Sequence, residues 1–148
     1  GKAASDVDAR AQLQSVIKNG EALRLFGELI KAQGGNAEVI ANPDLLPHAQ
    51  YQIEVPAKQR GYVSEIDADE VGVAAMLLGA GRATKEDVID LSVGIVLCRK
   101  IGDYVKEGEP LAILHSNKQQ VDDSIKLLQD HIYISAEKAE APSLIHSL

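Results

Sequence analysis

The sequence contains no tryptophan and only one cysteine, and aromatic side chains account for 3% of its 148 residues. A lone cysteine cannot form an internal disulfide. Because Cys98 lies in the apolar run VGIVLCRK, we expect a buried thiol in a reducing compartment. Basic runs are also absent and the net charge is −7, which argues against nucleic acid or an anionic membrane as a partner.

Long hydrophobic runs are missing as well. No apolar stretch is long enough to span a bilayer, and the N-terminal residues contain no signal-peptide hydrophobic region, so we expect a cytoplasmic protein. Hydrophobic residues nevertheless make up 45% of the chain, which is enough for one packed, largely aliphatic core. The length fits one domain, or one domain and a piece of another.

Residues 1–34 have the periodicity of two helices. Ser5 and Asp8 resemble a capping box, Asn19–Gly20 ends the first helix, and Gly34–Gly35 closes the second. Each helix carries an apolar stripe, and the stripes comprise Leu13, Val16, Ile17, Ala22, Leu25, Phe26, Leu29 and Ile30. Two short helices cannot bury both stripes against each other, so we expect them to need a surface that this segment lacks. Residues 35–50 contain Asn-Pro and Leu-Pro and read as a connector.

From residue 51 the pattern changes to strands that alternate with helices. Residues 51–56, 61–66, 93–100, 110–115 and 131–138 are predicted strands. Asp67, with Glu70 three residues later, predicts a helix start, and the apolar residues that follow predict a helix buried on more than one side. Ser116 and Gln119 predict a second helix start, and its apolar stripe is Val121, Ile125 and Leu128. The order β-β-α-β-β-α-β indicates a compact α+β domain.

The run IGDYVKEGEPLAILHSNK (101–118) is similar to a pattern found in small barrels that carry biotin or lipoate on a lysine. Gly102–Asp103 and Gly108 permit tight turns, and Val105, Leu111 and Ile113 supply core residues, so the pattern is explained without any cofactor. A carrier needs its lysine at the tip of a tight hairpin. Lys118 instead falls in the first turn of the predicted helix, so the helix start is the favoured interpretation and a carrier with Lys118 as attachment site is the alternative.

Other residues with chemical potential have structural explanations. The glycines of GAGR (79–82) follow a helix, whereas phosphate loops precede one. The carboxylates fall at predicted helix starts or turns, and they are Asp67, Asp69, Glu70, Glu86, Asp87 and Asp90, with Thr84 as the cap of the second group. The histidines, His48, His115, His131 and His146, lack metal-ligand spacing, and Cys98 has no nearby base. We therefore expect no catalytic residue, no metal site and no cofactor.

Residues 61–117 strongly resemble the C-terminal domain of pyrimidine-nucleoside and thymidine phosphorylases. The most specific part runs from Gly61 through the GAGR turn to Asp90 and Gly94, and the Gly102–Leu111 run follows at the expected distance. The helices of 1–34 and the AQGG turn at 32–35 resemble the end of the central domain of the same family. The resemblance therefore divides the chain into 1–50, the helical end of the central domain with a connector, and 51–148, the C-terminal domain.

This resemblance implies a fold and a reaction. The fold is an α/β-hammerhead type related to barrel-sandwich hybrids, in which the carrier-like run serves only to turn strands. The reaction is the reversible phosphorolysis of uridine, thymidine or deoxyuridine to free base and pentose 1-phosphate, in nucleoside salvage. The family's phosphate loop and base-binding residues precede this part of the enzyme, and no catalytic residue can be assigned here. The resemblance thus implies a scaffold domain, inactive alone, of a homodimeric enzyme whose central domain is its partner.

Overall fold

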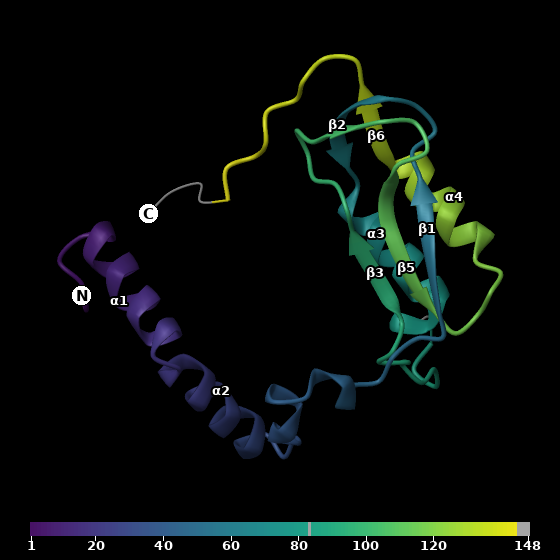
Figure 1. The fold of residues 1–148 in the computed structure, drawn as a ribbon. Helices are drawn as coiled ribbons and strands as arrows, with labels where there is room; N and C mark the ends of the chain where they lie inside the picture. Colours follow the sequence, from purple (N-terminus) through teal and green to yellow (C-terminus); the bar gives the residue numbers. More distant parts are fainter. Residues whose placement is uncertain (83, 145–148) are drawn as a thin grey trace. The chain divides into compact units, whose positions relative to one another are not determined.

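A computed structural model describes residues 1–82 and 84–144. The chain divides into two compact units, residues 1–46 and residues 47–148, which are considered separately (Figure 1). The division falls four residues before the boundary expected from the sequence. Two expectations fall on residues outside the described ranges, namely the histidine at 146 and the extension of the second domain to residue 148.

The first unit consists of helices and short turns. Helices α1 (Asp6–Lys18) and α2 (Glu21–Ala32) are followed by two 3-10 turns, η1 (Ala37–Ile40) and η2 (Pro43–Leu45). The Ser5 hydroxyl accepts a hydrogen bond from the Asp8 amide at 3.2 Å, as the capping box predicts. Gly20 separates the helices with φ of +82°, a backbone conformation that glycine adopts at little cost. Among residues 1–46, all of them described, none is buried.

The second unit contains two three-stranded antiparallel sheets. In the first sheet, β5 (Pro110–Ser116) lies between β1 (Tyr51–Pro56) and β3 (Gly94–Leu97). Tyr51 pairs with Ser116 at one end of this sheet, and His115 pairs with Gly94 across the other side of β5. In the second sheet, β2 (Gly61–Ile66) lies between β4 (Tyr104–Val105) and β6 (Ile132–Ser135), and a bulge interrupts β2 between Val63 and Glu65.

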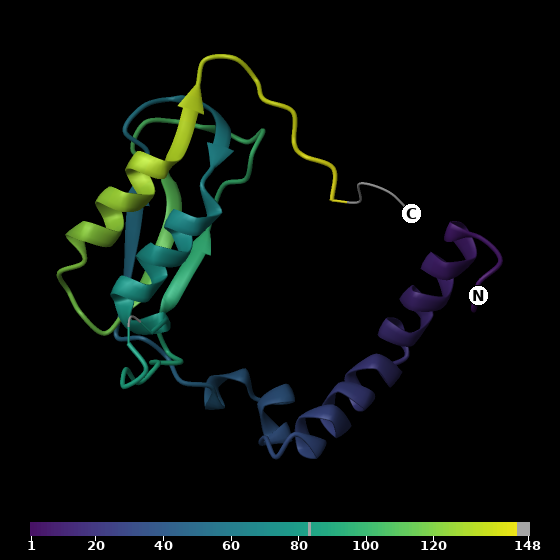
Figure 2. The ribbon, with the colours of Figure 1, turned by 180° about the vertical axis from the view of Figure 1, so that it is seen from behind.

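Two helices complete the second unit. Helix α3 (Ala68–Ala75) continues into the π-type turn η3 (Met76–Ala80), and it lies beside α4 (Asp122–His131) (Figure 2). The Ser124 hydroxyl of α4, which is buried, donates to the Ala74 carbonyl of α3 at 3.1 Å. A hydrophobic core joins strands and helices, and its most completely buried side chains are Val55, Val63, Ala74, Val105, Ala112, Leu114 and Leu128. The expected α+β class is confirmed for this unit.

The start of α4 was predicted wrongly. Ser116 does not cap a helix; it is the last residue of β5 and is fully buried. Its hydroxyl accepts the Lys118 amide at 2.9 Å, and the helix begins only at Asp122. Pairing of Ser116 with Tyr51 keeps the backbone extended, so the sheet prevails over the local capping signal. The apolar stripe was predicted correctly, since Val121 and Leu128 are buried and Ile125 is half-buried.

Three further expectations need correction. Strand β4 was predicted only as a turn, because two residues are too short to show alternation. The region α3–η3 is buried on one side only, since Val73 is 39% exposed and Leu77 is 45% exposed. Cys98 is half-buried rather than buried, because it follows the edge strand β3 instead of lying within a covered strand. None of the described helices has the length and apolar character that crossing a membrane requires.

Candidate functional site

The glycine-containing run between β3 and β5 forms two turns of the same design. Gly102 has φ of +94° and Gly108 has φ of +81°. In the first turn the Asp103 carboxylate accepts the Lys100 amide at 2.7 Å, and in the second the Glu109 carboxylate accepts the Lys106 amide at 3.1 Å. Each carboxylate thus closes its own turn, which supports the expectation that this run shapes strands and holds no cofactor.

Lys118 does not lie at the tip of a tight hairpin. It lies in the exposed loop between β5 and α4, and its backbone amide is bound by the Ser116 hydroxyl. The position in the first turn of a helix, predicted from the sequence, is wrong, but the geometry does not favour the carrier alternative either. A carrier lysine needs a tight turn between two paired strands, and here a strand is followed by a helix.

Most of the carboxylates singled out in the sequence stabilise local structure. Asp67 caps α3 by accepting the Glu70 amide at 3.5 Å, as predicted. Thr84 was expected to cap the turn at 84–87, but the Asp87 carboxylate instead accepts the Thr84 amide at 2.8 Å. The glycines of GAGR follow a helical segment, and Gly79 ends η3 with φ of +110°. Within 1–82 and 84–144, no three histidine, cysteine or acidic side chains are grouped so as to hold a metal ion.

Asp130 forms a charged link that the sequence pattern did not reveal. Its carboxylate contacts the Lys58 ammonium at 2.9 Å and also that of Lys126, so it joins the turn after β1 to helix α4. Hydrogen bonds from the two lysines lower the pKa of Asp130 to about 2. The linked side chains border a groove over Leu111 and Ile134, in which Gln59 and Gln129 donate to backbone carbonyls. These polar groups bind one another, which leaves none of them directed at a ligand.

Asn117 is the second feature that sequence reasoning missed. Its side-chain oxygen accepts the Gln50 amide at 2.9 Å, and its side-chain nitrogen donates to Asp90 and to the Ser92 hydroxyl, both at 2.8 Å. Hydrogen bonds from Ser92, and then from Asn117, lower the pKa of Asp90. The three partners of Asn117 are 25 to 67 residues away in sequence, so no local pattern could have indicated them.

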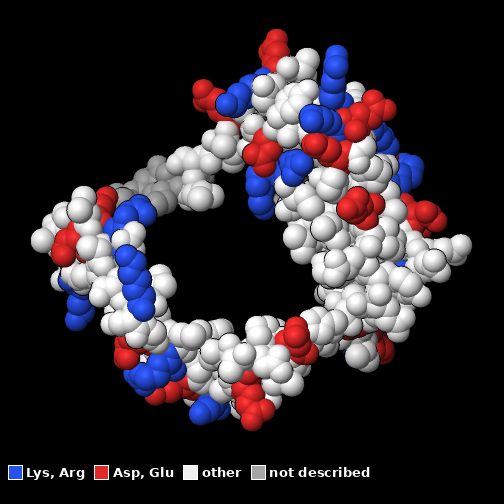
Figure 3. All heavy atoms as spheres, in the orientation of Figure 1, with Lys and Arg blue, Asp and Glu red and all other residues white. Residues whose placement is uncertain are grey.

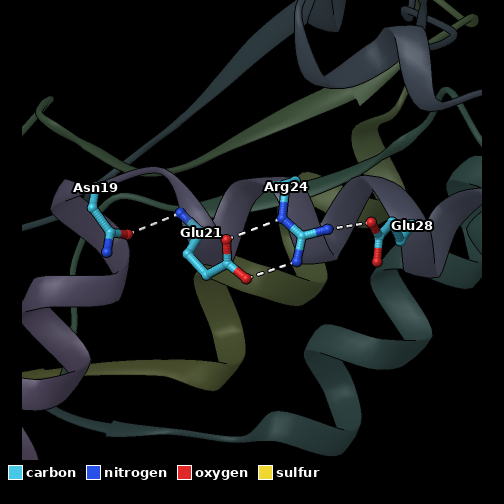
Figure 4. Close-up of polar contacts among 4 residues, drawn as sticks. All are labelled: Asn19, Glu21, Arg24 and Glu28. Carbon is cyan, nitrogen blue, oxygen red and sulfur yellow. Dashed lines mark hydrogen bonds and ion pairs between the residues drawn. The ribbon is translucent and has the colours of Figure 1, made fainter.

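Helix α2 carries a single polar stripe. The Asn19 side chain accepts the Glu21 amide at 3.0 Å, and the Arg24 guanidinium binds both oxygens of Glu21 and also reaches Glu28 (Figure 4). The guanidinium of Arg24 lowers the pKa of the Glu21 carboxyl. Residues 21, 24 and 28 are one helical turn apart, so these charges occupy one line along the helix.

The rest of α2 is apolar and uncovered. One groove over this helix is lined by Ala22, Leu25, Phe26, Glu28, Leu29 and Ala32. A second groove lies between α2 and the 3-10 turns, and it is lined by Leu23, Phe26, Ile30, Gly35, Asn36, Val39, Ile40, Pro43 and Leu46. A helix that is apolar on all but one line is typical of a buried helix. This apolar surface of α2 is the strongest candidate for an interaction site in the first unit.

Charged side chains give no comparable site. Acidic and basic side chains are interspersed over the visible face of both units, without a continuous surface of one sign (Figure 3). The described residues thus combine a folded α+β domain with a helical unit whose apolar surface is uncovered, which defines a non-catalytic part of a larger protein.

Comparison with known proteins identifies that class more closely. The family model of the pyrimidine nucleoside phosphorylase C-terminal domain matches residues 62–135, and the chain belongs to this family. A pyrimidine-nucleoside phosphorylase of Bacillus subtilis (strain 168) is 58% identical over 95% of this chain and 32% of its own length. A protein of the same name from Geobacillus stearothermophilus is 54% identical over 98% of this chain and 34% of its own length. The chain spans about a third of the length of the curated relatives it matches.

Proposed function

We propose that this chain is the C-terminal scaffold of an enzyme that phosphorolyses pyrimidine nucleosides in nucleoside salvage. The observation that carries the proposal is identity of 54–58% to two pyrimidine-nucleoside phosphorylases over nearly all of this chain and only a third of theirs. In the reaction a phosphate oxygen forms a bond to the anomeric carbon of uridine, thymidine or deoxyuridine. The glycosidic C–N bond breaks, its electron pair leaves with the pyrimidine, and the products are the base and pentose 1-phosphate.

The catalytic groups belong to the missing part of the enzyme. Such an enzyme, a pentosyltransferase, must position phosphate and stabilise the departing pyrimidine anion. The described residues of this chain include no grouped side chains suited to that chemistry, and the polar side chains of its main groove bind each other. We therefore assign no catalytic, cofactor-binding or metal-binding residue to the chain and propose that it is inactive alone.

The apolar surface of α2 supports a domain assignment. Residues 1–50 are proposed as the helical end of the central domain with a connector, and residues 51–148 as the C-terminal domain of the hammerhead type. Leu25, Phe26 and Leu29 are each more than half exposed in this chain, which suits helices that pack on the rest of the central domain. The parent enzyme is proposed to be a cytoplasmic homodimer that binds phosphate and a pyrimidine nucleoside.

An assay of the isolated chain beside the full-length enzyme tests this proposal. With phosphate and either thymidine or uridine, the full-length enzyme should release free base and the isolated chain should not. Both proteins are to be prepared from a host that lacks its own nucleoside phosphorylases. Base released by the isolated chain would overturn its role as an inactive scaffold. A full-length enzyme without activity on any pyrimidine nucleoside would overturn the proposed reaction.

A further inference from the structure

Three segments of the second unit meet at one end of the first sheet. Gln50 immediately precedes β1, Ser92 lies two residues before β3, and Asn117 immediately follows β5. They meet because β5 lies between the other two strands: Tyr51 pairs with Ser116, and Gly94 pairs with His115. The side chain of Asn117 binds the backbone of the first segment and the side chains of the second.

These contacts form a closed hydrogen-bond network, here called the polar clamp, made of Gln50, Asp90, Ser92 and Asn117. Asn117 uses its oxygen for the Gln50 amide and its nitrogen for Asp90 and Ser92. The Asp90 carboxylate also accepts the Ser92 amide at 2.9 Å and the Ser92 hydroxyl at 2.6 Å. The Asp90 amide donates to the Gly79 carbonyl at 3.0 Å, so the network is fixed to the end of η3 as well.

The segment just before the polar clamp has a different character. The two compact units divide between Leu46 and Pro47, and no helix or strand includes Pro47, His48 or Ala49. Pro47 and His48 are exposed, and the hydrogen bonds found among residues 1–82 and 84–144 include none made by these three residues. Fully extended, three residues reach at most about 11 Å, so this link is short as well as unsupported.

We propose that Pro47–Ala49 is a hinge between the two units and that the polar clamp is its fixed end. Asn117 is then a positioning residue: by holding the Gln50 amide it sets the direction in which the chain enters β1. Motion is confined to the three residues before Gln50, and the loop before β3 resists it through Asp90 and Ser92. This role concerns the link within the chain and does not depend on the proposed enzymatic function.

The test uses spin labels, one on each unit. In a Cys98→Ser background, Ser15→Cys on α1 and Asp123→Cys on α4 provide exposed labelling positions. Asn117→Ala should broaden the distribution of distances between the labels and increase amide exchange at Gln50 about tenfold, the effect of losing one hydrogen bond. Gln119→Ala is the matched control, because Gln119 is exposed in the same loop, and it should change neither measurement. An unchanged distance distribution in Asn117→Ala would overturn the proposal.

A second variant covers the case in which Asn117→Ala unfolds the second unit. Ser92→Ala removes one partner of Asn117 and one of Asp90 while keeping the Gln50 contact. It should broaden the distance distribution in the same direction but less. Amide exchange at Leu111–Leu114, inside β5, reports whether the sheet remains folded. Ser92→Ala with a folded sheet and the wild-type distribution would refute the clamp as the fixed end of a hinge.

Discussion

The two units of this chain differ in what holds them together. In residues 47–148, the centres of both sheets and one side of each helix supply a common core, and side chains such as Leu114 are completely buried. In residues 1–46 no residue is buried, and the polar contacts of α2 join neighbours on the same helix. Hydrophobic residues occur in both units, so it is the arrangement of apolar surface that decides whether a segment folds by itself.

The largest effect that would test this comparison is a difference in local stability. Amides of Leu13–Ile30 should exchange orders of magnitude faster than those of Val93–Leu97, because isolated short helices are marginal in water while the sheet is covered by a core. Residues 51–138 should also fold without residues 1–34. Hydrogen exchange on the intact chain measures the first expectation, and thermal unfolding of the shortened chain measures the second. Equal protection in both regions would show that the leading helices are held by contacts within this chain.

A pair of leucine substitutions tests the same contrast at single residues. Leu114→Ala should lower the free energy of unfolding by about 2–5 kcal/mol, because it leaves a cavity at the centre of β5. Leu25→Ala, at a position that is 58% exposed, should change it by no more than about 0.5 kcal/mol in the isolated chain. Denaturant unfolding followed by circular dichroism gives both values. A large loss with Leu25→Ala would mean that α2 is packed in solution.

A glycine in the second unit offers a smaller, backbone-based test. Gly108→Val should cost about 1–3 kcal/mol, because Gly108 has φ of +81° and a β-branched residue is strained there. No atom lies within 4 Å of the position that a Cβ would occupy, so the strain comes from the backbone alone. Gly72→Ala is the control: it is equally uncrowded but helical, and it should stabilise the chain. If both variants had the same stability, backbone strain at Gly108 would be excluded.

The charged links of the two units should differ in their dependence on pH. Asp130 joins parts of the second unit that are 72 residues apart, whereas Glu21 and Arg24 lie in one helix. Because folding lowers the pKa of Asp130 to about 2, its contribution to stability is present above the unfolded value of about 3.9 and is lost as pH falls toward 2. Stability of the second unit should therefore decrease over that interval, and the decrease should be smaller in Asp130→Asn. An identical pH profile in the variant would contradict the link.

The sequence predicted most of the fold because its signals are local. Caps at Ser5 and Asp67 and the alternation in residues 51–56 each depend on residues a few positions apart, and the structure confirms them. The failures have a non-local cause. Ser116 has the pattern of a helix cap but is held by a neighbouring strand, and Asn117 gains its role only when β1 and β3 flank β5. The interaction surface of α2 was predicted, because an unmatched apolar stripe is visible in the periodicity itself.

The smallest expected effect concerns Lys118, the residue that first suggested a carrier. Lys118→Ala removes an exposed charge and keeps the backbone bond to Ser116, so it should change the free energy of unfolding by no more than about 0.5 kcal/mol. The full-length enzyme should keep its turnover, whereas with Gly108→Val it should lose thermal stability. Intact mass of the chain purified from its natural host should show no biotin or lipoate adduct. Loss of turnover in Lys118→Ala without a change in melting temperature, or an adduct on Lys118, would restore the carrier interpretation, since neither follows from a residue that only separates a strand from a helix.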